Sequence, residues 1–202
     1  MDRVIGQSGS GPGIVTVREY EELVRGNFFG SKGSSPRIIL GILNARRPEL
    51  ALIAHQVSRE LKIHSDHVMI IDFPDVKAHI RNANMFNAHL YVGLNCVEVT
   101  DNYEHVVAYY ETPTYISQGG KSLAEGIVHE FGQSSVIAPR LVGMRLAVLR
   151  ETRMPAVVCT IGDCSAIIQY PKTYAEYLAK AIGKWVSAVM AGSPDASVAP
   201  VN

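Results

Sequence analysis

The chain has 202 residues, with 19 basic and 19 acidic side chains and an apolar fraction of 47%. This length supports one domain with a substantial core, and the balanced charge gives no reason to expect nucleic-acid or anionic-membrane binding. No apolar segment near the start predicts a signal peptide, and no apolar run reaches the ~20 residues that span a bilayer. We therefore expect a cytoplasmic protein with no nucleic-acid partner and no membrane span.

Composition divides the chain into three parts. Glycine and serine dominate the first 13 positions, so we expect residues 1–36 to be a flexible or arm-like segment, with a short helix or arm at 17–24. The composition of residues 192–202 predicts a disordered tail. The folded domain is then expected over residues 37–191.

Predicted strands and helices alternate along this domain. Continuous apolar runs predict strands buried on both faces at 38–43, 68–71, 88–94 and 156–161, with further strands at 97–99 and 106–110, the second suited to an edge. Apolar residues at helical spacing predict helices from Pro48 to Leu61, and over 76–85, 117–131 and 174–190. This order predicts an α/β fold of three layers, in which helices flank a mostly parallel central sheet.

Three fragments carry a resemblance to a known family. The stretch from Leu149 to Asp163, LRETRMPAVVCTIGD, is similar to a family pattern written VLR.T.mPavLvE.GF. Arg81-x-Ala83-Asn84 with the strand after it, and Ser122-Leu123-Ala124, match two further patterns in the same order and spacing. In these segments the chain resembles the zinc-dependent N-acetylmuramoyl-L-alanine amidases of the amidase_3 type, which cut cell-wall peptidoglycan. The resemblance implies an amidase-like fold over roughly residues 37–190.

The residues that do the chemistry in that family differ here. In the family, two histidines and a glutamate hold zinc and leave a position for water, and a further glutamate exchanges protons with the nucleophile and the leaving amine. The resemblance places Asn44 and Asn95 at the histidine positions and Thr160 at the position of the catalytic glutamate. Amide groups are poor zinc ligands, and threonine has no acid–base chemistry near neutral pH.

The loop after the first strand departs from the family in two further ways. Gly41 stands where the family has an aspartate, and the connection that carries its glutamate ligand is missing before Pro48. The nearest acid, Glu49, is expected inside the following helix.

These losses predict a catalytically inactive amidase fold, with no catalytic residues, no metal ligands and no cofactor. We expect its cleft to bind a protein partner or a small ligand such as a cell-wall fragment, in regulation of peptidoglycan metabolism. An oligomer is left open. The residues expected to line the cleft are Asn44, Arg46, Arg47, Asn95, Cys96, Thr160 and Asp163.

Other interpretations remain open from the sequence. The chain could be an active amidase or other amidohydrolase that binds zinc through atypical ligands, or a structural or assembly subunit. Asp163 could replace the lost acid or simply cap a turn. We expect the three cysteines to be reduced core residues, with a thiolate metal site or reactive thiol as the alternative. None of the seven histidines has metal-ligand spacing, so we expect surface or core roles for them.

Overall fold

The computed structural model describes residues 35–44, 46–96, 105–133, 138–162 and 170–191, and the backbone of 4–5 and 14–15. Strands β1 (Val4–Ile5) and β2 (Ile14–Val15) pair antiparallel. The expected helix or arm at 17–24, the strand at 97–99 and the tail at 192–202 lie outside the described residues.

A seven-stranded sheet forms the centre of the domain, in the order β4-β3-β5-β9-β6-β7, with β8 also paired to β6. Strands β4, β3, β5 and β9 run parallel, and β6 runs antiparallel to β9 but parallel to β8. The mostly parallel sheet expected from the sequence is therefore confirmed. Its strands are β3 (Arg37–Ile42), β4 (His67–Ile71), β5 (Leu90–Cys96), β6 (Val106–Thr112), β7 (Tyr115–Ile116), β8 (Arg140–Met144) and β9 (Ala156–Ile161).

One prediction about this sheet is wrong, because β6 is not an edge strand. It hydrogen-bonds to β9 on one side and to β8 on the other. Burial between two neighbours explains its continuous apolar run, Val106 to Tyr110. The sequence did not predict β7 or β8, which are short and only half-buried or exposed.

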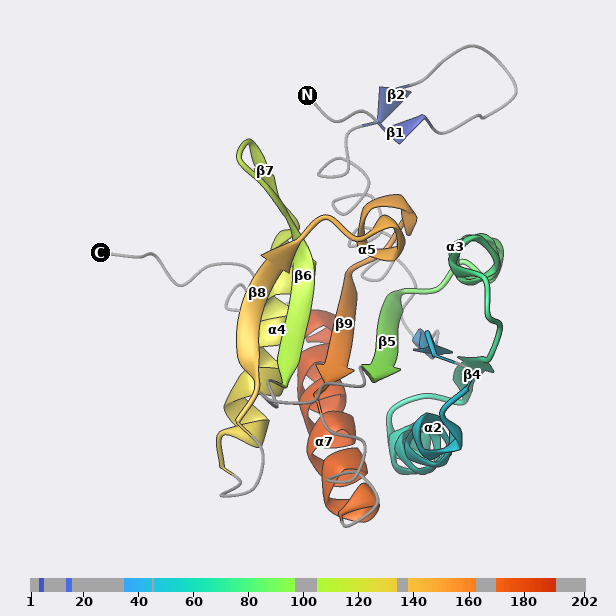
Figure 1. Ribbon diagram of the computed structural model, residues 1–202, viewed down its shortest axis with the longest axis vertical. Helices are drawn as coiled ribbons and strands as arrows, with labels where there is room; N and C mark the ends of the chain where they lie inside the picture. The colour runs from blue at the N-terminus through green and yellow to red at the C-terminus, as the bar shows by residue number, and fades with distance from the viewer. Residues whose placement is uncertain are drawn as a thin grey trace.

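Helices cover both faces of the sheet, which gives the expected three layers (Figure 1). The larger apolar cluster includes residues of three long helices, and the smaller cluster on the other face includes residues of two shorter ones. The first group is α2 (Pro48–Glu60), which continues into η1 (Leu61–Ile63), α4 (Gln118–Phe131) and α7 (Pro171–Met190). The second group is α3 (Val76–Met85) and α5 (Ala147–Glu151).

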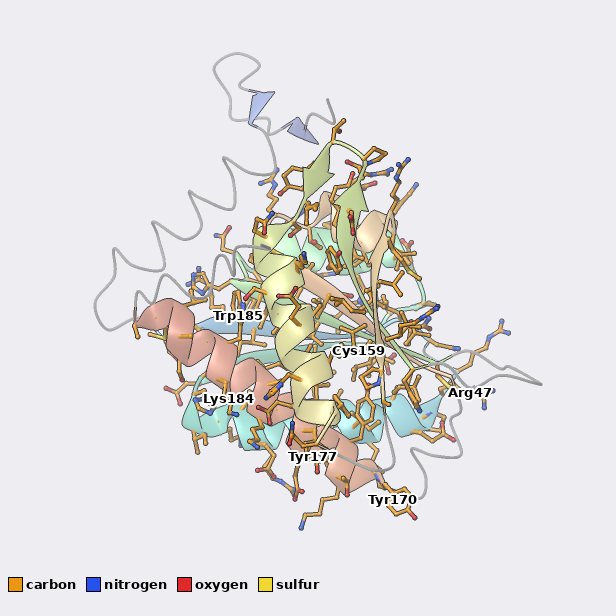
Figure 2. All side chains as sticks on the ribbon, turned by 90° about the vertical axis from the view of Figure 1, so that its left-hand side faces the viewer. Arg47, Cys159, Tyr170, Tyr177, Lys184 and Trp185 are labelled. Atoms are coloured by element: carbon orange, nitrogen blue, oxygen red, sulfur yellow. The ribbon has the colours of Figure 1, made fainter. Side chains whose placement is uncertain are left out.

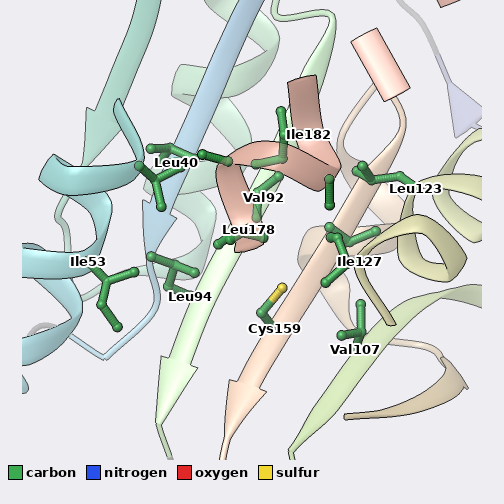
Figure 3. Packing of buried hydrophobic residues seen from close by; sticks show 14 of the residues in the cluster. Leu40, Ile53, Val92, Leu94, Val107, Leu123, Ile127, Cys159, Leu178 and Ile182 are labelled. Atoms are coloured by element: carbon green, nitrogen blue, oxygen red, sulfur yellow. The ribbon is translucent and has the colours of Figure 1, made fainter. Parts of the chain in front are cut away.

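The larger cluster is the main core of the domain (Figure 3). Leu94 and Cys159 of neighbouring strands pack there with Ile127 of α4 and Leu178 of α7. Leu94, Ile127 and Leu178 are fully buried, and burial of such a side chain contributes about 1.5–3 kcal/mol. The stability of the fold therefore comes mainly from this face.

A buried carboxylate joins α4 to α7 beside this core. Glu130 is 2% exposed, and its carboxylate oxygens lie 2.9 Å from Lys180 Nζ and 2.5 Å from Lys184 Nζ. Burial by itself raises the pKa of this carboxyl, but hydrogen bonds and charges from the two lysines lower the pKa overall. Glu130 thus stays ionised and holds the two helices together.

Two of the fragments that carry the family resemblance meet through one side chain. The Asn84 side-chain amide donates to the carbonyl oxygen of Glu151 at 3.0 Å and accepts from the backbone N–H of Arg153 at 2.9 Å. Asn84 lies at the end of α3, whereas Glu151 and Arg153 flank the turn from α5 into β9. The match at Asn84 therefore has a structural reason, since its side chain pairs two backbone groups of this turn.

A neutral histidine ties the starts of β3 and β5 at the opposite edge of the sheet. His89 is 8% exposed, and its Nδ1 accepts a hydrogen bond of 2.9 Å from the backbone N–H of Arg37. Burial, and then the positive charge of Arg37, lower the pKa of His89 to about 4. The native state therefore resists protonation of this ring.

This histidine should make stability depend on pH in the acid range. Because the native pKa lies below the ordinary 6.5, its contribution is complete above pH 6.5 and is lost as pH falls towards 4. His89→Asn keeps an acceptor for Arg37 but cannot titrate. Denaturant unfolding at pH 7 and pH 4 should show that the wild type loses about 1–2 kcal/mol more than this variant, after allowance for solvent screening. Equal losses in the two proteins would contradict this role for His89.

Candidate functional site

The carboxyl ends of three parallel strands meet at one edge of the sheet, where ligands bind in open α/β folds. Ile42 of β3 pairs with Leu94 of β5, and Asn95 of β5 pairs with Thr160 of β9. Because β6 is antiparallel, its first residue, Val106, pairs with Thr160 at the same edge. The strand ends that the sequence singled out are therefore neighbours in space.

Asn44 closes this edge on the side of β3. Its side-chain Nδ2 donates to the carbonyl oxygen of Cys96 at 3.0 Å, and its Oδ1 accepts from the backbone N–H of Arg46 at 3.3 Å. The first bond crosses from the end of β3 to the end of β5. Asn44 thus acts as a hydrogen-bonding brace between two strand ends.

Asn95 and Thr160 lie side by side on one face of the sheet. Side chains alternate along a strand, and the residues on either side of both positions belong to the larger core cluster. Asn95 and Thr160 consequently face the side of the smaller cluster, and both are half-buried. Leu43 covers Gly93 on this face, since a Cβ atom on Gly93 would lie 2.9 Å from Leu43 Cδ1. We call Leu43, Asn95 and Thr160 the strand-end shelf.

Cys96 is separated from this shelf. It packs in the larger cluster with 2% of its surface exposed, and it is disulfide-bonded. The expectation of three reduced cysteines is therefore wrong for Cys96.

Cys159 is a free thiol in the interior of the molecule (Figure 2). Burial raises its pKa to about 12, so the thiol stays protonated and unreactive at neutral pH. With Cys96 bonded and Cys159 protonated, these two residues do not supply the thiolate metal site that the sequence left open.

Two further predicted cleft residues, Arg46 and Arg47, lie just before the start of α2. The connection from Asn44 to Pro48 is short, as expected, and Glu49 lies in the first turn of the helix. Arg46 is exposed, whereas Arg47 is half-buried and lies at the periphery of the molecule in Figure 2. Asp163 lies outside the described residues, so its expected role stays a prediction.

The space at Gly41, near the end of β3, is filled by a buried histidine–tyrosine pair. Tyr91 Oη donates to Nδ1 of His79 at 3.0 Å, and the other ring nitrogen, Nε2, donates to the carbonyl oxygen of Phe73 at 2.9 Å. Burial lowers the pKa of His79 and raises the pKa of Tyr91, so both groups are neutral. A Cβ atom on Gly41 would lie 2.1 Å from Tyr91 Oη and 2.8 Å from His79 Nδ1. No side chain fits at Gly41 without displacement of this pair.

One histidine that the sequence did not single out lies at the strand-end edge. His105 directly precedes Val106, the partner of Thr160, and its carbonyl oxygen accepts from the backbone N–H of Arg140 at 2.7 Å. Only the antiparallel direction of β6 brings it there, and no spacing in the sequence signals that direction.

All seven histidines lie in the described residues. None of those described residues forms a group of three His, Cys, Asp or Glu side chains suited to a metal ion.

A groove of about 270 Å³ lies elsewhere, between the end of α2, η1 and α7. His64 packs there against Gly183, where a Cβ atom would lie close to its ring. This groove is beside the start of β4, so it is at the other edge of the sheet from the shelf.

Among the described helices, none has the length and apolar character needed to cross a bilayer.

Comparisons with known proteins agree with the fold. No family profile matches the sequence, and no curated protein matches it either. Among solved structures, the chain is similar to the N-acetylmuramoyl-L-alanine amidase AmiC2 of Nostoc punctiforme, with a TM-score of 0.62 and 21% identity over 77% of this chain and 99% of that one. It has the fold of these amidases.

Two further amidases give the same result. The catalytic domain of CwlV from Bacillus (Paenibacillus) polymyxa var. colistinus has a TM-score of 0.60 and 16% identity, over 75% of this chain and 98% of that one. The N-acetylmuramoyl-L-alanine amidase from Clostridium difficile 630 has a TM-score of 0.59 and 18% identity, over 79% of this chain and 100% of that one. At these identities the similarity establishes the amidase fold, which confirms the fold expected from the sequence.

Substitution of Gly41 tests the close packing behind the shelf. Gly41→Ala should destabilise the domain by about 1–3 kcal/mol in urea unfolding, because the new methyl group displaces buried Tyr91 and His79. Gly41→Ala with Tyr91→Phe should regain part of this loss, since the phenol oxygen is the nearest atom.

The matched control is Gly126→Ala in α4, where a Cβ atom would meet nothing within 4 Å. This change should raise stability by about 0.5–1 kcal/mol through helix propensity. A Gly41→Ala protein as stable as the wild type would show that the pair does not fill this space.

Proposed function

We propose that this protein is a non-catalytic relative of N-acetylmuramoyl-L-alanine amidases, whose strand-end shelf binds a ligand or a protein partner in cell-wall metabolism. The observation that carries the proposal is the set of side chains at the strand ends. Asn95 and Thr160 are paired neighbours and Asn44 braces the same edge, so an amidase fold presents neutral groups at these ends. Zinc hydrolysis needs imidazole and carboxylate ligands together with a proton-transferring group.

The surroundings of Gly41 support the same proposal. The resemblance matches Gly41 to an aspartate of the amidase family. In this chain His79 and Tyr91 occupy the space that a side chain at Gly41 would need. Both nitrogens of His79 are engaged, to Tyr91 and to the Phe73 carbonyl oxygen. His79 is therefore a structural residue and does not replace a lost ligand.

The chemistry of the shelf suggests what it binds. Asn95 carries both a donor and an acceptor, Thr160 offers a hydroxyl, and Leu43 adds apolar surface over Gly93. Exposed Arg46 adds a cation that can pair with a carboxylate. A muramyl peptide presents amide groups, hydroxyl groups and carboxylates, so a cell-wall fragment is the ligand class we favour.

A binding assay and an activity assay on the same preparation test the proposal. Isothermal titration with muramyl dipeptide should show saturable binding, and Asn95→Ala with Thr160→Ala should weaken it by about 10-fold, the effect of losing one or two hydrogen bonds. Lys172→Ala is the matched control, because this exposed lysine lies on α7 and pairs with Glu176. No binding of either muramyl dipeptide or purified peptidoglycan would count against a cell-wall ligand.

The activity assay separates this proposal from an active amidase with atypical ligands. We expect no release of stem peptides from purified peptidoglycan, with or without added zinc. His105 is the one imidazole that directly precedes a strand at this edge, so His105→Ala is the informative variant. Stoichiometric zinc in the purified protein, with stem-peptide release that this variant abolishes, would establish the active alternative instead.

A further inference from the structure

The groove beside α7 has an almost fully exposed isoleucine on its rim. Ile63 ends η1 and is 84% exposed, more than any other large apolar side chain in the described residues. It lines the same groove as His64, the residue that follows it. A projecting apolar side chain and a cavity thus adjoin on one surface.

Small residues of α7 line the groove on its other side. Ala179 and Gly183 are buried there, and their small size leaves space above the helix. The volume of about 270 Å³ is below the ~300–1,000 Å³ of typical small-molecule pockets. The groove is therefore better suited to a single apolar side chain from a protein than to a large free ligand.

The rim of the groove carries both signs of charge in equal number. Glu60 and Glu176 supply two negative charges, and Lys180 and Lys184 supply two positive charges. The lysine side chains also hold buried Glu130, yet they remain 55% and 62% exposed, so they are accessible to a partner. A balanced rim does not favour a strongly acidic or strongly basic partner. It does favour a second copy of itself, in which the acids of one copy can face the lysines of the other.

We propose that this groove is the interface of a homodimer, in which Ile63 of each copy enters the groove of the other. In a twofold interface the same patch is used by both copies, so a projecting residue beside a cavity is matched by a cavity beside a projecting residue. Met190 extends the apolar surface, since it is 42% exposed and lies two helical turns after Gly183 on the same side of α7. The proposal is independent of the proposed function, because the groove and the strand-end shelf are at different edges of the sheet.

Sedimentation velocity of the full chain tests this interface. The wild type should pass from monomer to dimer between about 1 and 100 µM, the range expected for an interface of modest affinity. Ile63→Asp should weaken association by at least about 100-fold, because each dimer loses two buried isoleucines. This variant should fold normally, since Ile63 is exposed in the monomer, and thermal unfolding at low concentration checks that it does.

Two further variants separate the roles of the isoleucine and the groove. Ser187→Phe adds no charge but places a ring at an exposed position that lines the groove, so it should also weaken the dimer. Met85→Asp is the matched control, because Met85 is 75% exposed but lies on α3, on the other face of the sheet. It should leave the dimer unchanged. A wild type that stays monomeric throughout, or a dimer that either groove variant leaves intact, would overturn the proposal.

Discussion

The in-register parallel pairing of β3, β5 and β9 is the constraint on which the rest of the structure depends. Each strand hydrogen-bonds to the next over five or six residue pairs, so the three carboxyl ends come to one edge regardless of the side chains there. Asn95 beside Thr160 follows directly from this register. A slip of one residue would turn both side chains into the larger core.

The alternation of side chains along these strands separates stability from function. Leu94, Cys159 and Ile161 face the larger core, which provides most of the apolar burial, whereas Asn95 and Thr160 face away from it. The residues of the shelf can therefore change without loss of the fold. This independence explains how an amidase fold can be retained while its strand ends carry neutral groups, and why fold alone does not establish activity.

The sequence predicted the parts of the fold that are governed by local pattern. Long apolar runs predicted the buried strands, and helical spacing predicted α2, α3, α4 and α7. Both signals depend only on residues that are close together in the sequence. Features that depend on pairing across the sheet were missed or misjudged: the short strands β7 and β8, the interior position of β6, and His105, which the direction of β6 brings to the edge where β3, β5 and β9 end. The disulfide of Cys96 was missed for a related reason, since cysteine spacing does not show which thiols meet.

If the protein is the non-catalytic relative proposed above, charge balance explains why its differences from the family occur together. A cluster of imidazoles and carboxylates is stable because the metal compensates its charge, and a carboxylate left there alone would be half-buried without a counter-ion. Asn44, Asn95 and Thr160 are all neutral, so they can share an edge without a cation. Asn44 also supplies a hydrogen bond to the end of β5, and the disulfide of Cys96 adds a covalent tie at the same place. The hydrogen bond from Asn44 and the disulfide of Cys96 thus both act on the end of β5.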